Sequence, residues 1–275
     1  MQRRLAILLV LPLVLLVGGL FLMPVLRILA ISFTEPVAGM GNYVALFSEP
    51  VYLKIMATTL RVCAITTVIT LLMGYTVAYV MANVTPSLRG WMIVFLLVPF
   101  WLSVQVRAFA WVLLLSREGL VNATLISLGV IDKPLALLRN ETGVLIGMVH
   151  YMVPYAVLPM LTNMLGMDRS LMAASRALGA GPVRTFLYVY FPLSLPGVLA
   201  SAVLVFIFCL GFFITPALLG GGKTMMVAQY IEFGISETMN WGISTAFATV
   251  LLVSVLLSLA LMSRYVRLPS LFGAS

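Results

Sequence analysis

Six long apolar stretches constrain this chain more than any other feature of its sequence. Runs of roughly 20 apolar residues are long enough to cross the hydrocarbon core of a bilayer. A segment in lipid must satisfy its own backbone hydrogen bonds, and the alternating pattern of an outer-membrane barrel is absent. We therefore expect an all-α integral membrane protein with six transmembrane helices, at about residues 5–31, 57–83, 91–115, 141–166, 195–219 and 241–263.

The composition agrees with this class of protein. Of the 275 residues, 63% are hydrophobic and 9% are charged, whereas a soluble domain carries about 25% charged residues. Arg3 and Arg4 precede the first run as in a signal peptide, but the run is long and Arg27 follows it, so we expect an uncleaved first span. Nothing in the sequence marks a second domain, which predicts one transmembrane domain over residues 1–275.

The distribution of charge predicts the orientation. With six spans, both termini and the loops after the second and fourth spans lie on one side, and this side is rich in basic residues. It is therefore expected to be cytoplasmic, with the acids gathered on the other side. The formal net charge of +8 then reflects membrane topology and does not imply binding to nucleic acid. The basic residues of the predicted cytoplasmic side are Arg3, Arg4, Arg89, Arg169, Arg176, Arg184, Arg264 and Arg267, against the single acid Asp168.

The loop between the fourth and fifth spans, residues 167–194, has a helix-turn-helix pattern, and we call it the elbow. Asp168 is placed to N-cap a helix through Leu178, and Gly179 to supply a left-handed C-terminal residue. Pro182 can open a second short helix at its first position. Its arginines give it a positively charged surface suited to docking a soluble partner. The alternative is an ordinary cytosolic loop, which would carry basic residues in any case.

The elbow also carries a motif. It resembles the signature of binding-protein-dependent ABC importer permeases: Glu-Ala-Ala, three residues, Gly, nine residues, Ile, one residue, Leu-Pro. Ala174, Gly179 and Pro192 agree with that signature, and Ala173 stands where the signature has its glutamate. Over nearly its full length the chain looks like the spermidine/putrescine permease group, with similar stretches around Asn42–Leu53, Pro99–Trp111, Gly129–Asp132 and Pro216–Gly222.

The resemblance implies a type I ABC importer fold in a bacterial inner membrane. It also implies a complex with a second homologous permease in a heterodimer, two cytoplasmic ATPases and an extracytoplasmic binding protein. ATP and Mg would be bound by the ATPases, so this chain would be a transport subunit that binds no cofactor and is not an enzyme. The residues implied in coupling to the ATPases are Asp168, Ala173, Ala174, Ser175, Arg176, Gly179, Ala180, Pro182 and Pro192.

Polar and aromatic residues at membrane depth indicate a translocation path. Arg107 is costly in lipid and should face protein or a wet cavity, as part of a gate or, alternatively, as an arginine that snorkels to the outer interface. The predicted path consists of Trp101, Arg107, Trp111, Tyr151, Tyr155 and Glu232. The nearby His150 either contacts substrate or, as a lone histidine more often does, donates to a backbone carbonyl.

Other functions and substrates remain as alternatives. One histidine and two separated cysteines cannot form a metal cluster, and an ion-coupled secondary transporter would usually carry midplane acids. A polyamine would favour carboxylates and aromatic faces, such as Glu232 near the outer face, whereas Arg107 would favour an anionic group. The same machinery could import an opine, an amino-acid derivative or another small organic solute.

Overall fold

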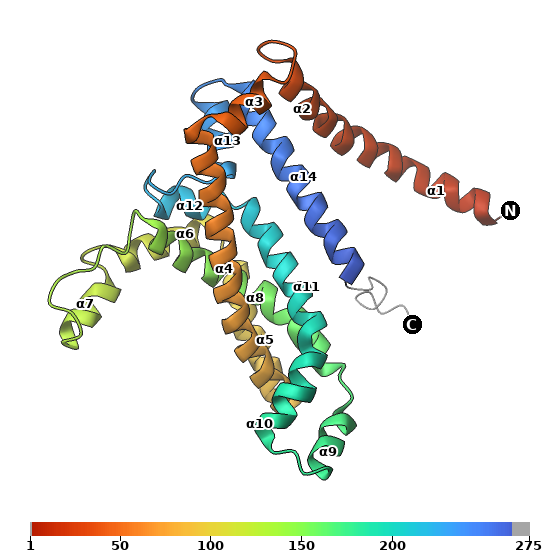
Figure 1. Cartoon of the computed structure of the whole chain (residues 1–275), viewed down its shortest axis with the longest axis vertical. Coiled ribbons are helices and arrows are strands. Elements are labelled where there is room, and N and C mark those ends of the chain that lie inside the picture. Colours follow the sequence, from red (N-terminus) through yellow and green to blue (C-terminus); the bar gives the residue numbers. More distant parts are fainter. Residues whose placement is uncertain (1, 266–275) are drawn as a thin grey trace. The chain divides into compact units, whose positions relative to one another are not determined.

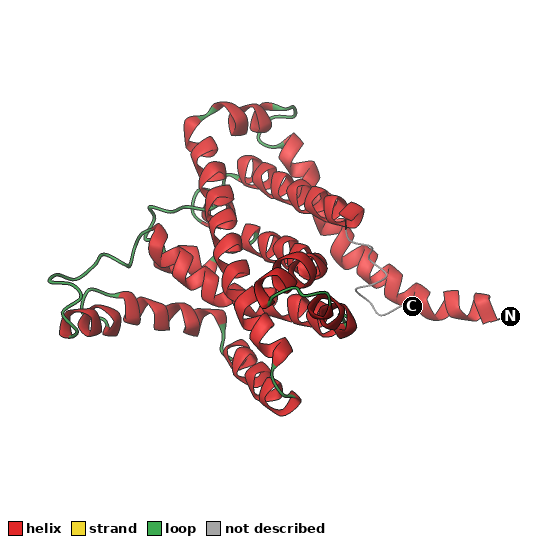
Figure 2. Ribbon diagram, turned by 60° about the horizontal axis from the view of Figure 1, so that its bottom comes forward, coloured by secondary structure: helices red, strands yellow, loops and turns green. Residues whose placement is uncertain are grey.

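The computed structural model describes residues 2–265, with side chains from residue 10 to residue 260. Arg267, one of the basic residues assigned above to the cytoplasmic side, lies outside the described residues. Within residues 2–265 every regular element is a helix and there is no strand (Figure 2). Six helical segments are long and apolar enough to span a membrane, which confirms the predicted number: Val10–Thr34, Pro50–Asn83, Val104–Ser127, Glu141–Leu165, Pro182–Leu210 and Trp241–Ala260.

The chain divides into two compact units, and each is described by itself. The first contains residues 1–56 and 230–254, and the second contains residues 57–229 and 255–275. Three helices, α4 (Pro50–Asn83), α13 (Val227–Ser236) and α14 (Trp241–Tyr265), contain residues of both units. That residues 1–275 act as one permease domain stays a prediction.

The first unit begins with a long exposed helix. A five-residue π-helical turn, Gly18–Leu22, joins α1 (Gln2–Val17) to α2 (Met23–Thr34) without a break in helical backbone. None of the most apolar stretch of Val10–Thr34 is buried. An apolar helix with no buried face is suited to contact with lipid or with another membrane protein.

One short helix, α3, is hydrogen-bonded to the end of this long helix. Asn42, in α3 (Gly41–Ser48), donates from Nδ2 to the carbonyls of Ser32 and Glu35 at 2.8 and 2.7 Å. In the same unit the Tyr230 ring, from α13 (Val227–Ser236), lies 5.0 Å from the ring of Phe247 between centroids. All of these residues except Phe247 lie outside the predicted spans.

The second unit is built on α4, α8 (Glu141–Leu165) and α11 (Phe191–Leu210), which lie side by side (Figure 1). Small residues allow the close approach, as the sequence predicted. A Cβ added at Gly74 of α4 would lie 2.9 Å from the Ala156 Cβ of α8. On the other side of α8, Ser201 of α11 donates to the Ala156 carbonyl at 2.8 Å. Ala156 is therefore the point at which both neighbouring helices touch α8.

Two contacts fix the direction of α4 and α8. Arg61, in the N-terminal half of α4, forms an ion pair with Glu141 in the first turn of α8 at 2.5 Å. At the opposite ends, the Arg169 guanidinium donates to the Ala82 carbonyl at 2.8 Å. The two helices are thus parallel, so the chain between them must cross the membrane an odd number of times.

The segment predicted as one uninterrupted third span is broken. The structure has α5 (Pro86–Leu97), a 3-10 turn at Val98–Trp101, extended backbone at Leu102 and Ser103, and then α6 (Val104–Leu115). Pro99 removes a helical donor, and the Ser103 hydroxyl accepts from the Val106 N–H at 3.2 Å to start a new helix. The prediction of one continuous helix over residues 91–115 was therefore wrong, because the helix is interrupted between α5 and α6.

The fifth span also differs from its expected bounds. The short helix α10 (Pro182–Thr185) continues through a π turn at Phe186–Tyr190 into α11, so one helical run covers Pro182–Leu210. Pro192 has no N–H for the Tyr188 carbonyl, and the wider π turn just before it absorbs the mismatch. The run ends at Gly211, and α12 (Ile214–Leu219) is a separate helix within the range 195–219 expected for the fifth span.

Candidate functional site

The first helix of the elbow starts as its sequence predicts. Helix α9 (Arg169–Ala177) has Asp168 as its N-cap, and the Asp168 Oδ1 accepts from the Ser170 N–H at 2.9 Å. This backbone hydrogen bond holds the pKa of the exposed Asp168 carboxyl below its ordinary value. A charged acceptor at a helix N-terminus also stabilises the helix through the macrodipole.

The same helix ends in a Schellman motif. Gly179 has φ +86°, and its N–H donates to the Arg176 carbonyl at 3.0 Å, while the Ala180 N–H donates to the Ser175 carbonyl at 3.1 Å. This 5→2 and 6→1 pair defines the motif, and it requires a left-handed residue at the position of Gly179. The predicted C-terminal glycine is confirmed, with Leu178 as the C-cap in place of the last helical residue.

The second half of the elbow is held against the first. Pro182 occupies the first position of α10, after Gly181 as N-cap, as predicted. The Ser175 and Thr185 hydroxyls lie 3.2 Å apart, which links α9 to α10. The elbow therefore consists of two short helices joined by a turn of defined geometry. It continues directly into a membrane-spanning helix.

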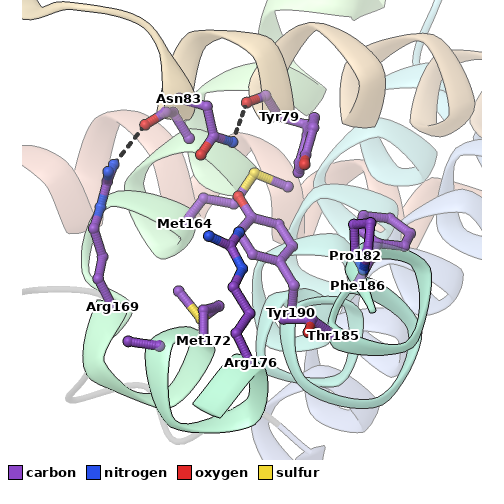
Figure 3. Close-up of a pocket in the computed structure, with 12 residues that line it drawn as sticks. Tyr79, Asn83, Met164, Arg169, Met172, Arg176, Pro182, Thr185, Phe186 and Tyr190 are labelled. Atoms are coloured by element: carbon purple, nitrogen blue, oxygen red, sulfur yellow. Dashed lines mark hydrogen bonds between the residues drawn. The ribbon is translucent and has the colours of Figure 1, made fainter. Parts of the chain in front are cut away.

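The elbow is anchored to the membrane part of its unit by Arg169. The Arg169 guanidinium donates to the Ala82 carbonyl at the end of α4, and Figure 3 marks the hydrogen bond of Arg169 with a dashed line. The last carbonyls of a helix have no intrahelical donor, and a cation there is favoured by the helix dipole. This hydrogen bond therefore links the elbow to the C-terminal end of α4.

The predicted path residues are partly brought together. Arg107 is 8% exposed, and its guanidinium carbon lies 4.3 Å from the ring centroid of Tyr151 and 5.8 Å from that of Phe100. Tyr155 stacks on Tyr151 with centroids 5.9 Å apart and also meets Phe100 at 5.1 Å. Arg107 is thus a buried cation packed on aromatic faces, a favourable arrangement where water is scarce.

Two further rings complete what we call the aromatic cluster: Phe100, Tyr151, Tyr155, Phe208 and Phe212. Phe212 lies 4.7 Å from Tyr151, and Phe208 lies 4.7 Å from Tyr155, between ring centroids. Neither phenylalanine was predicted from the sequence, and nor was Phe100. Phe208 lies in the last turn of α11, and Phe212 follows the end of that helix, so helical spacing does not predict that the two rings meet the same cluster.

Trp111 and His150 form a separate pair. The Trp111 Nε1–H donates to His150 Nδ1 at 3.3 Å, so the histidine accepts a hydrogen bond from an indole. Both side chains line an apolar cavity of about 650 Å³ that also involves α4 and α5. Arg107 is not among the residues that line this cavity.

Two predicted path residues lie elsewhere. Trp101 is 86% exposed, and its neighbour Phe100 takes the place in the cluster. Glu232 is exposed on α13 and belongs to the first unit, whereas the aromatic cluster belongs to the second. A shared path between Glu232 and Arg107 therefore stays a prediction.

Two prolines in α8 lie beside the aromatic cluster. Pro154 and Pro159 lie inside the helix, and their missing N–H groups leave the carbonyls of His150 and Tyr155 without the usual helical donor four residues on. Such carbonyls at membrane depth are tolerated where they face protein or a wet cavity. They add hydrogen-bond acceptors to a region that is otherwise aromatic.

Six apolar helices long enough to span a membrane, with a polar elbow between the fourth and fifth, define a multi-pass membrane protein. The chain belongs to the family of binding-protein-dependent transport system inner membrane components, whose profile matches residues 67–268. It is a permease subunit of an ABC importer in the bacterial inner membrane, and members of this family are transport components, not enzymes.

Among its relatives are spermidine/putrescine transport system permease proteins called PotB. The chain is 32% identical to the one from Haemophilus influenzae over 247 residues, with 86% of each chain covered. It is 30% identical to the one from Escherichia coli K12 over 237 residues, again with 86% of each covered.

A solved structure has the same fold. A bacterial ABC transporter that imports the acidic polysaccharide alginate matches with a TM-score of 0.74 at 17% identity, covering 96% of both chains. The alginate transporter in complex with a pentasaccharide-bound periplasmic protein matches with a TM-score of 0.76 at 16% identity, covering 95% of this chain and 93% of that one. At this level of identity the likeness establishes the fold.

Proposed function

We propose that this chain forms the path for a polyamine such as spermidine or putrescine in an ATP-driven importer. Its partners would be a second permease, two ATPases that bind ATP and Mg, and an extracytoplasmic binding protein. The PotB relatives are named for spermidine and putrescine transport, and an alginate transporter of the same fold is described with a periplasmic protein. Both termini and the elbow would face the cytoplasm.

The observation that carries the substrate class is the guanidinium of Arg107 against the Tyr151 ring at 4.3 Å. Aromatic faces at membrane depth suit an organic cation, because the attraction comes from the ring quadrupole and strengthens when water is excluded, and a polyamine would use the rings of the cluster that Arg107 does not cover. The freed carbonyls of His150 and Tyr155 would accept hydrogen bonds from an ammonium group.

An anionic substrate is less well supported by the same geometry. The Arg107 guanidinium is buried and faces aromatic rings, and its Nε has no hydrogen-bond partner among the described residues. A receptor for carboxylate would instead present its donors to an open, wet cavity. The exposed Glu232 would help to attract a cation at the outer mouth.

We further propose that the elbow is where the chain meets its ATPase. The support is its build: a capped helix, a fixed left-handed turn at Gly179, and the hydrogen bond from Arg169 to the Ala82 carbonyl. Closure of the ATPases on ATP would then move α4 and α11 with the elbow as a rigid body, which is a common way to drive alternating access.

The test is uptake by the complete importer in proteoliposomes that contain ATP. We expect spermidine or putrescine to be transported, and opines or amino-acid derivatives at equal concentration not to compete. Uptake should require ATP and should continue after ion gradients are collapsed. Uptake that stops when the gradients are collapsed would favour an ion-coupled secondary transporter. Tyr151→Leu should reduce uptake while Tyr151→Phe retains most of it, because the ring face is kept. Equal loss in both variants would argue against cation–π recognition.

A further inference from the structure

The elbow encloses a cavity that coupling to an ATPase does not explain. It has a volume of about 250 Å³ and lies between α9, the start of the fifth span and the end of α4 (Figure 3). Two arginines, Arg169 and Arg176, lie on its wall, and no carboxylate does. The lining consists of Tyr79, Ala82, Asn83, Met164, Arg169, Met172, Ala173, Arg176, Pro182, Thr185, Phe186 and Tyr190.

The positive charge in this cavity is not neutralised within the described residues that line it. Arg169 donates one hydrogen bond to the Ala82 carbonyl, which carries no charge. Ala173 lies one helical turn before Arg176, where a carboxylate would pair with it, and offers none. An arginine carries five donors, so the pair leaves several available to an incoming anion.

A buried hydroxyl also points to a missing partner. Tyr190 is 8% exposed, and its buried hydroxyl meets only the Asn83 side chain, outside ordinary hydrogen-bond geometry. The adjacent Asn83 side chain donates to the Tyr79 carbonyl at 2.8 Å. Figure 3 shows the Tyr190 ring and the Arg176 guanidinium together in the cavity. A buried polar atom without a partner costs free energy unless a ligand or water satisfies it.

The cavity adjoins an apolar groove. A second hollow of about 430 Å³ shares Tyr79, Pro182 and Phe186 with the cavity, and its other lining residues are Tyr75, Thr76, Val183 and Leu187. The groove is lined by α4 and the start of the fifth span. The two hollows together have a cationic head and an apolar tail.

We propose that this cavity and groove bind one anionic phospholipid, with its phosphate at Arg169, Arg176 and the Tyr190 hydroxyl and an acyl chain along the groove. The charge of the cavity and the apolar character of the adjoining groove fit both ends of such a molecule. Free phosphate shares the head chemistry but would leave the groove empty. The proposal rests on the proposed placement of the elbow at the cytoplasmic membrane surface.

The test uses the complete importer, purified and transferred to nanodiscs of phosphatidylcholine with or without phosphatidylglycerol. Native mass spectrometry should show one retained phosphatidylglycerol per copy of this chain, and inorganic phosphate at millimolar concentration should not displace it. Displacement by phosphate would overturn the lipid as the occupant. No preference between the two lipids would overturn the site altogether.

Four variants locate the lipid without disturbing the anchor at Ala82. Arg176→Gln should weaken retention roughly fivefold, the effect of one basic residue at an anionic surface. Ala173→Glu should weaken it as much by adding an acid to the wall, whereas the matched Ala173→Gln should not. Arg89→Gln, a basic residue that lines neither hollow, should leave retention unchanged. Equal retention in Ala173→Glu and Ala173→Gln would contradict the placement of the phosphate.

This experiment separates failure of the lipid site from failure of the proposed transport function. Lipid retention is measured without substrate, so it does not depend on polyamine transport. If Ala173→Glu weakened only the association of the ATPase and left lipid retention intact, the cavity would belong to an acidic group of that partner and the lipid proposal would fall.

Discussion

Arg169 and Ala82 are 87 residues apart in sequence, and the guanidinium of one donates to the carbonyl of the other at 2.8 Å. This contact joins the first residue of α9 to the last turn of α4. It connects the elbow to the membrane helices in addition to the two chain connections. The contact makes Arg169 the residue whose loss should loosen α9 most.

Replacing Arg169 by glutamine should raise amide hydrogen exchange across residues 169–177. A hydrogen bond to a charged group is worth about 1.5–3 kcal/mol when buried; this one is part-buried, so we expect a smaller effect, about fivefold faster exchange. The readout is hydrogen–deuterium exchange by mass spectrometry on the assembled importer. Arg184→Gln, on the same elbow, is the control, and equal changes in both variants would contradict a specific anchor.

Gly179 should tolerate asparagine but not valine. Its φ of +86° is costly for a β-branched residue, by roughly 1–2 kcal/mol, while asparagine adopts this region more readily. An added Cβ would meet nothing within 4 Å, so the cost lies in the backbone and not in a clash. Gly179→Val should therefore uncouple ATP hydrolysis from uptake, with a raised ratio of ATP hydrolysed to substrate imported.

The matched control is Gly181, which has the same open surroundings but a negative φ of −67°. Gly181→Ser should keep normal coupling, since serine is a favourable N-cap for α10. Normal coupling in Gly179→Val would count against the docking role of this turn.

Asp168 should make the start of α9 sensitive to acid. Its pKa is lowered in the folded protein by the Ser170 N–H, so the stabilisation is present above the ordinary carboxyl pKa and is lost as pH falls through the folded value. Hydrogen exchange in residues 169–173 should therefore rise in wild type relative to Asp168→Asn between pH 5 and pH 3, since asparagine caps without titrating. A constant ratio across this interval would remove the carboxylate from the cap.

The elbow was predictable because its geometry depends on neighbours in sequence. A capping aspartate, a left-handed glycine and a proline at the first helical position each act within a few residues. The small-residue contact of Gly74 with α8 was predictable for a related reason, since a strip of small residues on one helix face announces a close approach. The partner helix was not predictable from that strip.

The rest depends on tertiary packing. Hydropathy treats residues 91–115 as one apolar run, and it does not register that Pro99 and Ser103 together end one helix and begin another. The aromatic cluster gathers rings from three separate segments, so Phe208 has no local sign that it meets Tyr155. Likewise, the ion pair of Arg61 with Glu141 joins positions 80 residues apart.

The predicted orientation can be read with single cysteines in a background that lacks Cys63 and Cys209, both buried. A cysteine at Arg176 and one at Lys223 should be labelled by a membrane-impermeant maleimide from opposite sides. Lys223 is preferred to the neighbouring Gly221, whose φ of +56° and close approach to Arg139 disfavour any side chain. Labelling of both positions from one side would overturn the six-span topology.

The path prediction compares one buried cation with one exposed acid. Arg107→Gln removes the cation from the aromatic cluster, at a cost of about 0.5–2 kcal/mol, and should lower the uptake rate severalfold while docking of the binding protein is unchanged. Arg107→Lys keeps the charge, so it should retain more activity.

If the substrate is a polyamine, Glu232→Gln should raise the concentration needed for half-maximal uptake, because an acid near the outer mouth attracts cations. High salt should abolish the difference. An anionic substrate would reverse the order, with Arg107 the more sensitive position and Glu232→Gln neutral or favourable. Wild-type uptake in both variants at all substrate concentrations would make both residues structural and would move the search for the path to the cavity lined by Trp111 and His150.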